Sequence, residues 1–309
     1  MASPVLVTKP VAANLAADLD LSTDALHAVL SLASQVKKNP KKYSQSIAGS
    51  YVSLLFEKPS LRTRLTFELA VKQLGGDVVT VVGPIGDREP VKDVARNLDR
   101  WTHAIVARVF SQSTIDELAQ WSSAPVINAL SDLYHPCQAL ADAQTLLEHF
   151  GSLEGKKVAY IGDGNNVAHS LMLTLTRLGA QMSIATPQGY QPDPGITAEA
   201  GKYGHILLTT DRDSAVEDAH AVYTDVWASM GQESEAAKRR RIFAPYQVNE
   251  ALLAKARPDA VFMHCLPAKR GQEVTDAVME SPRSVVFDQA ENRLHAQKAL
   301  LIALMKGLP

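Results

Sequence analysis

The chain has 309 residues, of which 46% are hydrophobic and 21% charged, and its formal net charge is -2. This composition excludes a disordered chain, the charge gives no reason to expect a nucleic acid or an anionic membrane as partner, and the length favours two domains. The two cysteines, Cys137 and Cys265, have no C-x-x-C spacing, which excludes a disulfide framework and a cysteine zinc site. Without a leader-like or membrane-spanning segment, the sequence predicts a soluble, cytoplasmic protein.

Short apolar runs alternate with longer segments of helical periodicity, which predicts repeated strand–helix units around parallel sheets. In the first half, strands are expected at 51–56, 77–82, 104–109 and 125–128. A helix is expected at 62–74 and ends before two glycines, because glycine readily adopts the backbone conformation that closes helices. A second helix is expected at 137–150.

The second half repeats this rhythm. Strands are expected at 157–161, 181–185, 205–209, 221–224, 260–264 and 284–287. We therefore predict an α/β protein with two domains, 1–150 and 151–309, each a parallel sheet flanked by helices, the second of them Rossmann-like. The last helix, at about 290–306, is expected to pack back on the first domain.

Ligands of open parallel sheets bind beyond the carboxyl ends of the strands, so the residues that follow each strand are the candidates for a site. After the first strand, Ser60 and Thr63 can cap a helix whose N-terminus attracts an anion. The hydroxyls and the guanidiniums of Arg62 and Arg64 add donors that suit phosphate oxygens. A capped surface helix with solvated arginines explains the same residues, and this segment alone does not decide between the two interpretations.

Two further strand ends in the first half carry polar side chains. Arg108 lies at the end of the third strand, and His135 and Gln138 follow the fourth. A lone arginine or histidine is more often structural than catalytic. Placed at the same sheet edge as Arg62, however, a histidine that donates to a carbonyl oxygen favours acyl transfer from an acyl phosphate.

The segment 162–166, Gly-Asp-Gly-Asn-Asn, follows a strand and opens a helix, which is typical of a dinucleotide site. Val167 stands where the third glycine of that motif is required, and the next strand does not end in an acidic residue. This argues against NAD. The amide side chains of Asn165 and Asn166 instead suit the polar groups of an amino acid.

Three more segments carry chemistry. Asp225 ends a strand before a loop with Ser229 and Met230, and such a carboxylate binds a cationic amine or merely caps a helix. Cys265 also ends a strand, where an inert buried thiol is the common outcome. The basic run 238–241 is interpreted as a solvated helix face.

These segments together resemble the ornithine carbamoyltransferase family in the order of six motifs, SLRTR, HPCQ, GDGNN, DVWASMGQE, HCLPA and AENRLHAQ. The resemblance covers nearly the whole chain. It implies an N-terminal domain that binds carbamoyl phosphate and a C-terminal domain that binds L-ornithine. It also implies a homotrimer, or an assembly of trimers, with active sites at subunit boundaries and no metal or organic cofactor.

The resemblance also implies roles for particular residues. The residues assigned to phosphate and the carbamoyl group are Ser60, Leu61 (through its main chain), Arg62, Thr63, Arg108, His135 and Gln138. The residues assigned to ornithine or the reacting groups are Asn166, Asp225, Ser229, Met230, Cys265, Leu266 (through its carbonyl) and Arg293. In this scheme Arg62, Arg108, His135 and Arg293 stabilise the developing oxyanion and the leaving phosphate, whereas Asp225 and Cys265 position and deprotonate the amine.

The chain departs from the family pattern in two places. Leu61 replaces a threonine and removes one hydroxyl from the phosphate segment. The loop 82–90, which the resemblance assigns to the neighbouring subunit's site, lacks the glutamine often found there. The alternatives are sister carbamoyltransferases acting on putrescine, aspartate or an acylated ornithine, and a non-enzymatic nucleotide-binding module.

Overall fold

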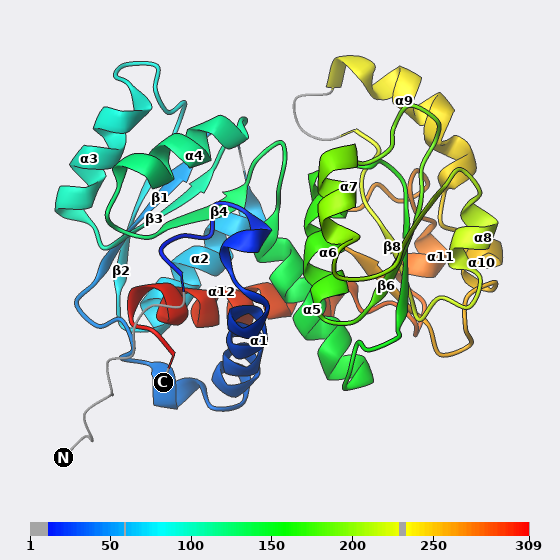
Figure 1. Ribbon diagram of the computed structural model, residues 1–309, viewed down its shortest axis with the longest axis horizontal. Coiled ribbons are helices and arrows are strands. Elements are labelled where there is room, and N and C mark those ends of the chain that lie inside the picture. The colour runs from blue at the N-terminus through cyan, green and yellow to red at the C-terminus, as the bar shows by residue number, and fades with distance from the viewer. Residues whose placement is uncertain (1–11, 59, 229–232, 309) are drawn as a thin grey trace. The chain divides into compact units, whose positions relative to one another are not determined.

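The computed structural model describes residues 12–58, 60–228 and 233–308 (Figure 1). These residues form two compact units, the first up to Gln144 and from Arg293 onward, the second from Thr145 to Asn292. The chain leaves the first unit within α5 (Pro136–Phe150) and returns to it within α12 (Val286–Met305). The first unit is therefore discontinuous in sequence.

Within the described residues, the first unit contains a four-stranded parallel sheet in the order β2-β1-β3-β4. Its strands are β1 (Tyr51–Phe56), β2 (Asp77–Val82), β3 (Ala104–Arg108) and β4 (Val126–Leu130). The strand order changes direction between β1 and β3. In parallel α/β sheets, the crevice at such a point is where ligands bind.

Helices cover this sheet because strands buried on both faces need apolar partners on each. The helical elements are η1 (Asp18–Asp20), α1 (Thr23–Lys38), η2 (Pro40–Tyr43), α2 (Leu61–Gln73), α3 (Val91–Trp101) and α4 (Gln112–Trp121). Ala95 of α3 and Ile115 and Leu118 of α4 join Leu55 and Ile105 of the strands in one buried cluster. Helix α2 contacts β1 and β2.

The second unit contains a parallel sheet in the order β7-β6-β5-β8-β9, with the change of direction between β5 and β8. Its strands are β5 (Lys157–Ile161), β6 (Gln181–Ala185), β7 (Ile206–Thr209), β8 (Ala221–Thr224) and β9 (Val261–His264). Its helices are α6 (Asn166–Arg177), α7 (Pro194–Ala200), α8 (Arg212–Val216), η3 (Glu233–Glu235), α9 (Ala236–Phe243), η4 (Ala244–Tyr246), α10 (Glu250–Leu253) and α11 (Asp276–Met279). Residues of α8, α10 and α11 form one buried cluster with the sheet.

The predicted fold class, two parallel sheets flanked by helices, is confirmed. The strand predicted at 284–287 is wrong. Ser284 makes only an isolated bridge to Phe262, and α12 already begins at Val286. A short apolar run does not distinguish a strand from the buried start of a helix. Among the helices of the described segments, none is long and apolar enough to cross a membrane.

Candidate functional site

The first candidate site lies where β1 and β3 end. Ser60 is the N-cap of α2, and its hydroxyl accepts the Thr63 N–H at 3.3 Å. A capped helix start directs its remaining N–H groups and the positive end of its dipole toward an anion. Arg108 is the last residue of β3, which neighbours β1 in the sheet. The helix start and the arginine are therefore held at the same sheet edge.

Thr63 is the point where two buried arginines meet. Its hydroxyl accepts hydrogen bonds from Arg108 Nη1 at 3.5 Å and from Arg293 Nη2 at 2.6 Å. Arg293 Nη1 also donates to Gln138 Oε1 at 2.9 Å, and Gln138 donates to Asp142 at 2.8 Å. Five residues far apart in the sequence thus form one hydrogen-bonded cluster. Because Arg108 and Arg293 are only 8% and 3% exposed, an anion that joined them would be attracted with little screening by water.

His135 lies in the field of the same arginines. Burial, followed by the charges of Arg293 and Arg108, lowers the pKa of His135 well below its ordinary value. The imidazole is therefore neutral at neutral pH, a state in which one ring nitrogen donates and the other accepts. A neutral histidine can hydrogen-bond an oxygen without adding a third full charge to the cluster.

The remaining residues of the segment 60–64 differ in surroundings. Arg62 is partly buried, whereas the side chain of Leu61 is 70% exposed. Arg64, one of the two guanidiniums expected to face phosphate, instead pairs with Glu68 at 2.9 Å on the exposed side of α2. For Arg64, the structure thus favours the solvated arginine of the two interpretations, because positions two apart on a helix face different directions.

The second candidate site lies where β5, β8 and β9 end. Asn165 is the N-cap of α6, and its Oδ1 accepts the N–H groups of Val167 and Ala168. Gly164 is required because a Cβ there would meet the backbone nitrogen of Pro192 at 2.2 Å. The second glycine of the Gly-x-Gly pattern thus allows the backbone at Pro192 to approach closely. Asn166 is buried at the first position of α6.

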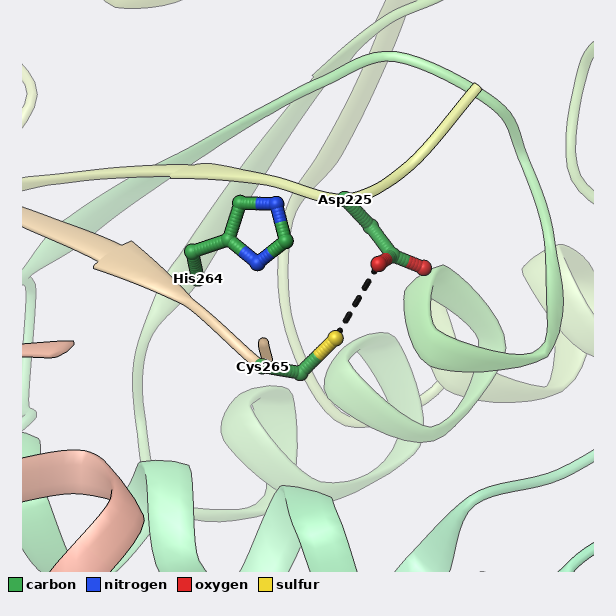
Figure 2. A group of neighbouring side chains, drawn as sticks. All are labelled: Asp225, His264 and Cys265. Atoms are coloured by element: carbon green, nitrogen blue, oxygen red, sulfur yellow. Dashed lines mark hydrogen bonds between the residues drawn. The ribbon is translucent and has the colours of Figure 1, made fainter. Parts of the chain in front are cut away.

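Asp225 is the centre of this second group (Figure 2). Its Oδ1 accepts from the Cys265 thiol at 3.0 Å and its Oδ2 from the Asn165 amide at 2.9 Å. Tyr160 in turn donates to Asn165 Oδ1 at 3.2 Å. Burial first, and then the charges of Asp225 and Asp163, raise the pKa of Tyr160 well above its ordinary value, so the phenol keeps its proton. The carboxylate of Asp225 is thus hydrogen-bonded by two neutral donors, an arrangement that suits a cationic ligand.

Leu266 has a left-handed backbone, with φ of 57°, which strains a residue other than glycine. Its N–H donates to His264 Nδ1 at 2.9 Å, and His264 Nε2 lies 3.3 Å from Glu273 Oε1. Asp225, His264 and Cys265 each offer an atom within 4.8 Å of the others, a spacing that suits a metal ion (Figure 2). Both nitrogens of His264 are already engaged, so these three residues do not fit the four-ligand site that zinc needs.

The basic run 238–241 contributes one buried residue to this unit. Lys238, Arg240 and Arg241 are exposed as expected, but Arg239 is only 7% exposed and pairs with Asp163 at 2.7 Å. Arg239 also donates to the carbonyl oxygen of Trp227 at 3.0 Å. The prediction of a fully solvated face was therefore wrong, because one side of this helix faces the end of β5. Two residues predicted to bind ornithine, Ser229 and Met230, lie outside the described residues.

Family models match both halves of the chain. The family model described as "Aspartate/ornithine carbamoyltransferase, carbamoyl-P binding domain" matches residues 14–148, and the one described as "Asp/Orn binding domain" of the same family matches residues 154–304. The chain belongs to the aspartate/ornithine carbamoyltransferase family. The resemblance inferred from the motifs is thereby confirmed.

Individual members of the aspartate/ornithine carbamoyltransferase family are similar over almost the full length. The ornithine carbamoyltransferase of Thermococcus kodakarensis is 50% identical over 301 residues, covering 94% of this chain and 95% of the relative. The anabolic ornithine carbamoyltransferase of Pyrococcus furiosus is 48% identical over 301 residues, with 94% and 95% covered. A solved structure of ornithine carbamoyltransferase from Pyrococcus furiosus superimposes with a TM-score of 0.92 at 47% identity, covering 98% of this chain and 100% of that chain.

Sequence reasoning missed several contacts in both sites. It gave Thr63 a role at the phosphate but not its role in joining Arg108 to Arg293, which are separated by 185 residues. It also assigned no role to Tyr160, which lies inside a strand, where the period-2 pattern indicates only burial. The N-cap role of Asn165 could have been predicted, because an asparagine that follows a strand and precedes an apolar helical run is a typical N-cap.

Proposed function

We propose that the chain transfers a carbamoyl group from carbamoyl phosphate to the side-chain amine of L-ornithine, giving L-citrulline and phosphate. The observation that carries the proposal is the pair of buried guanidiniums of Arg108 and Arg293 on the Thr63 hydroxyl, at the capped start of α2. Two buried cations held together by a neutral group favour an anionic ligand of high charge density, and carbamoyl phosphate is such a ligand.

The first unit is assigned to carbamoyl phosphate. Ser60, Arg62 and Thr63, with the free N–H groups of the first turn, take the phosphate oxygens. When the amine adds to the carbamoyl carbon, negative charge develops on the carbonyl oxygen and then passes to the departing phosphate. Arg108, Arg293 and the neutral His135 stabilise that charge, and such preorganised donors typically contribute the largest share of catalysis.

The second unit is assigned to ornithine. The carboxylate of Asp225 favours a substrate that carries a cationic amine, whereas aspartate as substrate would call for basic residues at this place. The amine attacks only when neutral, so it must lose one proton first. Asp225 and Cys265, joined by a hydrogen bond of 3.0 Å, are the groups that receive that proton or orient the amine.

A citrulline assay with four acceptors tests the proposal. Purified protein is incubated with carbamoyl phosphate and ornithine, putrescine, aspartate or acetylornithine, and the carbamoylated product is quantified for each. We expect ornithine to give a kcat/KM at least about 100-fold above the others. Aspartate leaves the buried carboxylate of Asp225 without a cation, and the segment with Ser229 and Met230, assigned to ornithine by the resemblance, distinguishes it from putrescine and acetylornithine. A higher value for any other acceptor contradicts the proposed substrate.

We also propose a homotrimer as the smallest assembly, supported by two exposed apolar rows in the first unit. Leu61, Leu65 and Leu69 repeat every fourth residue on α2 and are 70%, 47% and 45% exposed. Val79 and Val81 lie on one face of the edge strand β2 and are 53% and 52% exposed. A long edge strand and apolar rows of this kind are usually covered in a stable protein. Light scattering on wild type and Val79→Lys tests the assembly: we expect a trimer mass for wild type and a lower mass for the variant.

Two further assignments complete the proposal. A role in arginine biosynthesis is supported by the similarity to the Pyrococcus furiosus protein named as anabolic. A cytoplasmic location is supported by the two free thiols, Cys137 and Cys265, which fit a reducing compartment.

A further inference from the structure

Glu57 follows β1 directly, and its carboxylate binds the backbone of two other loops. Its Oε1 accepts the N–H of Ile85 at 2.9 Å, and its Oε2 accepts the N–H of Phe110 at 2.8 Å. The N–H of Glu57 itself donates to the carbonyl oxygen of Arg108 at 2.9 Å. Glu57 thus connects the segment that follows β1 to the loops that follow β2 and β3.

The two loops that Glu57 binds follow β2 and β3, at the sheet edge where the anion site lies. Phe110 comes two residues after Arg108, whose guanidinium reaches Thr63. Ile85 lies in the loop 82–90, which follows the edge strand β2. Since β2 and β3 lie on opposite sides of β1, the Glu57 carboxylate joins the loops on both sides of its own strand. The next residue, Lys58, lies with its ammonium 4.6 Å from the centre of the Phe110 ring and adds a second contact to the same loop.

We propose that Glu57 is a positioning residue for carbamoyl phosphate, holding the backbone around Arg108 and the loop 82–90 at the sheet edge where the anion site lies. The inference rests on the proposed function, because it names the substrate of that same site. Both carboxylate oxygens are used on backbone N–H groups, and such charge-assisted hydrogen bonds are roughly twice as strong as neutral ones. An amide at this position accepts only one of the two N–H groups and directs its own donor at the other.

The first unit offers a matched control at the other end of its sheet. Asp99 of α3 accepts the N–H groups of Ser123 at 2.9 Å and Ala124 at 2.7 Å, just before β4 begins. Its side chain therefore also binds two backbone N–H groups, although both are accepted by the same oxygen, Oδ1. It lies at the amino ends of the strands, away from Arg108 and Thr63, which sit at the carboxyl ends. Loss of Asp99 weakens the fold without touching the anion site.

The test compares Glu57→Gln and Glu57→Ala with Asp99→Asn and Asp99→Ala in the full chain. Citrulline formation is followed at a temperature well below every unfolding midpoint, with carbamoyl phosphate varied and ornithine saturating. We expect kcat/KM for carbamoyl phosphate to fall about tenfold in Glu57→Gln and about 100-fold in Glu57→Ala, since displacements near 1 Å have effects of this size. Both Asp99 variants should keep wild-type kcat/KM within about twofold. The unfolding temperature should drop in Asp99→Ala as in Glu57→Ala, and less in Asp99→Asn, whose amide oxygen still accepts both N–H groups.

Two results overturn the inference. One is a Glu57→Ala enzyme whose kcat/KM for carbamoyl phosphate stays within twofold of wild type. The other is an Asp99→Ala enzyme whose kcat/KM for carbamoyl phosphate falls as much as that of Glu57→Ala, because the loss would then come from a general decrease in stability.

A binding measurement separates this inference from the proposed function. Inorganic phosphate is titrated calorimetrically into wild type, Glu57→Ala and Asp99→Ala, which needs no turnover. If wild type forms no citrulline, the proposed function fails. Weaker phosphate binding in Glu57→Ala alone still supports the positioning role, and equal binding in all three proteins refutes it.

Discussion

The two candidate sites treat charge in opposite ways. In the first unit, Arg108 and Arg293 bring two like charges to one neutral hydroxyl, that of Thr63. In the second unit, the carboxylate of Asp225 accepts hydrogen bonds from the neutral side chains of Asn165 and Cys265. Under the proposed function, this difference explains how one chain recognises two substrates of opposite charge, with cations gathered for a phosphate in one unit and a carboxylate for an amine in the other.

Removal of a cation from the first site is expected to have the largest effect. Arg62→Gly should leave the fold intact and lower kcat about 1,000-fold, because the donors to the developing charge are fewer. Steady-state kinetics and circular dichroism measure the two quantities. Arg64→Gly, on the same helix turn but paired with Glu68, is the control and should stay close to wild type. Near-normal turnover in Arg62→Gly contradicts the assignment of the first site.

Neutralisation of the anion in the second site comes next. Asp225→Asn keeps the size of the side chain and removes its charge, so kcat/KM for ornithine should fall about 100-fold, as is typical when one member of a buried charge pair is lost. Phosphate binding to the first unit, measured by calorimetry, should be unchanged. Asp213→Asn removes an exposed carboxylate of the same unit and serves as the control. A loss of phosphate affinity in Asp225→Asn would remove the contrast between the two sites.

The two units also contain buried groups whose ionisation affects stability in opposite directions. His135 faces Arg293 and Arg108, and its pKa is lowered by burial and by those charges; stability therefore falls as pH drops through 6.5, where the unfolded chain takes up a proton. Burial raises the pKa of Asp163 to about 6, against the effect of Arg239 and with support from Asp225 and Glu235. Between pH 6 and pH 4 this carboxyl therefore adds stability on acidification, by about 3 kcal/mol at most.

Urea unfolding at a series of pH values tests this opposition. Relative to wild type, His135→Gln should lose less stability on acidification from pH 7 to pH 5, and Asp163→Asn should lose more. His27→Gln, at an exposed position of α1, should follow the wild-type profile. If the free energy of unfolding depends on pH in the same way in His135→Gln and Asp163→Asn, the two groups do not have opposite effects on stability.

The smallest expected effect concerns Leu61. Leu61→Thr supplies a hydroxyl at the first position of α2, next to the helix N–H groups. The KM for carbamoyl phosphate should fall about threefold, in line with one added hydrogen bond of modest net strength. Leu61→Val is the control, because valine has the shape of threonine without its hydroxyl. An equal decrease in KM in both variants would assign the effect to side-chain shape.

The strands were predictable from sequence because each is a short apolar run with polar residues at its ends. Position relative to a strand end was enough to find Ser60, Arg108, Asp225 and Cys265. It failed for Arg239, because the partner that buries it, Asp163, is 76 residues away and no local pattern reports such a pairing. It failed at 284–287 for a related reason, since Val285 and Val286 are buried at the start of a helix and not in a sheet, while Phe287 is exposed.

The discontinuity of the first unit has a consequence for how the protein is made. Arg293, which binds both Thr63 and Gln138, is supplied by the last 17 residues of the chain. During translation, the cluster of Thr63, Arg108 and Gln138 therefore cannot include Arg293 until α12 has left the ribosome. A polypeptide interrupted anywhere in the second unit carries the phosphate segment but lacks one of its two buried arginines, so premature termination yields a product without a complete site.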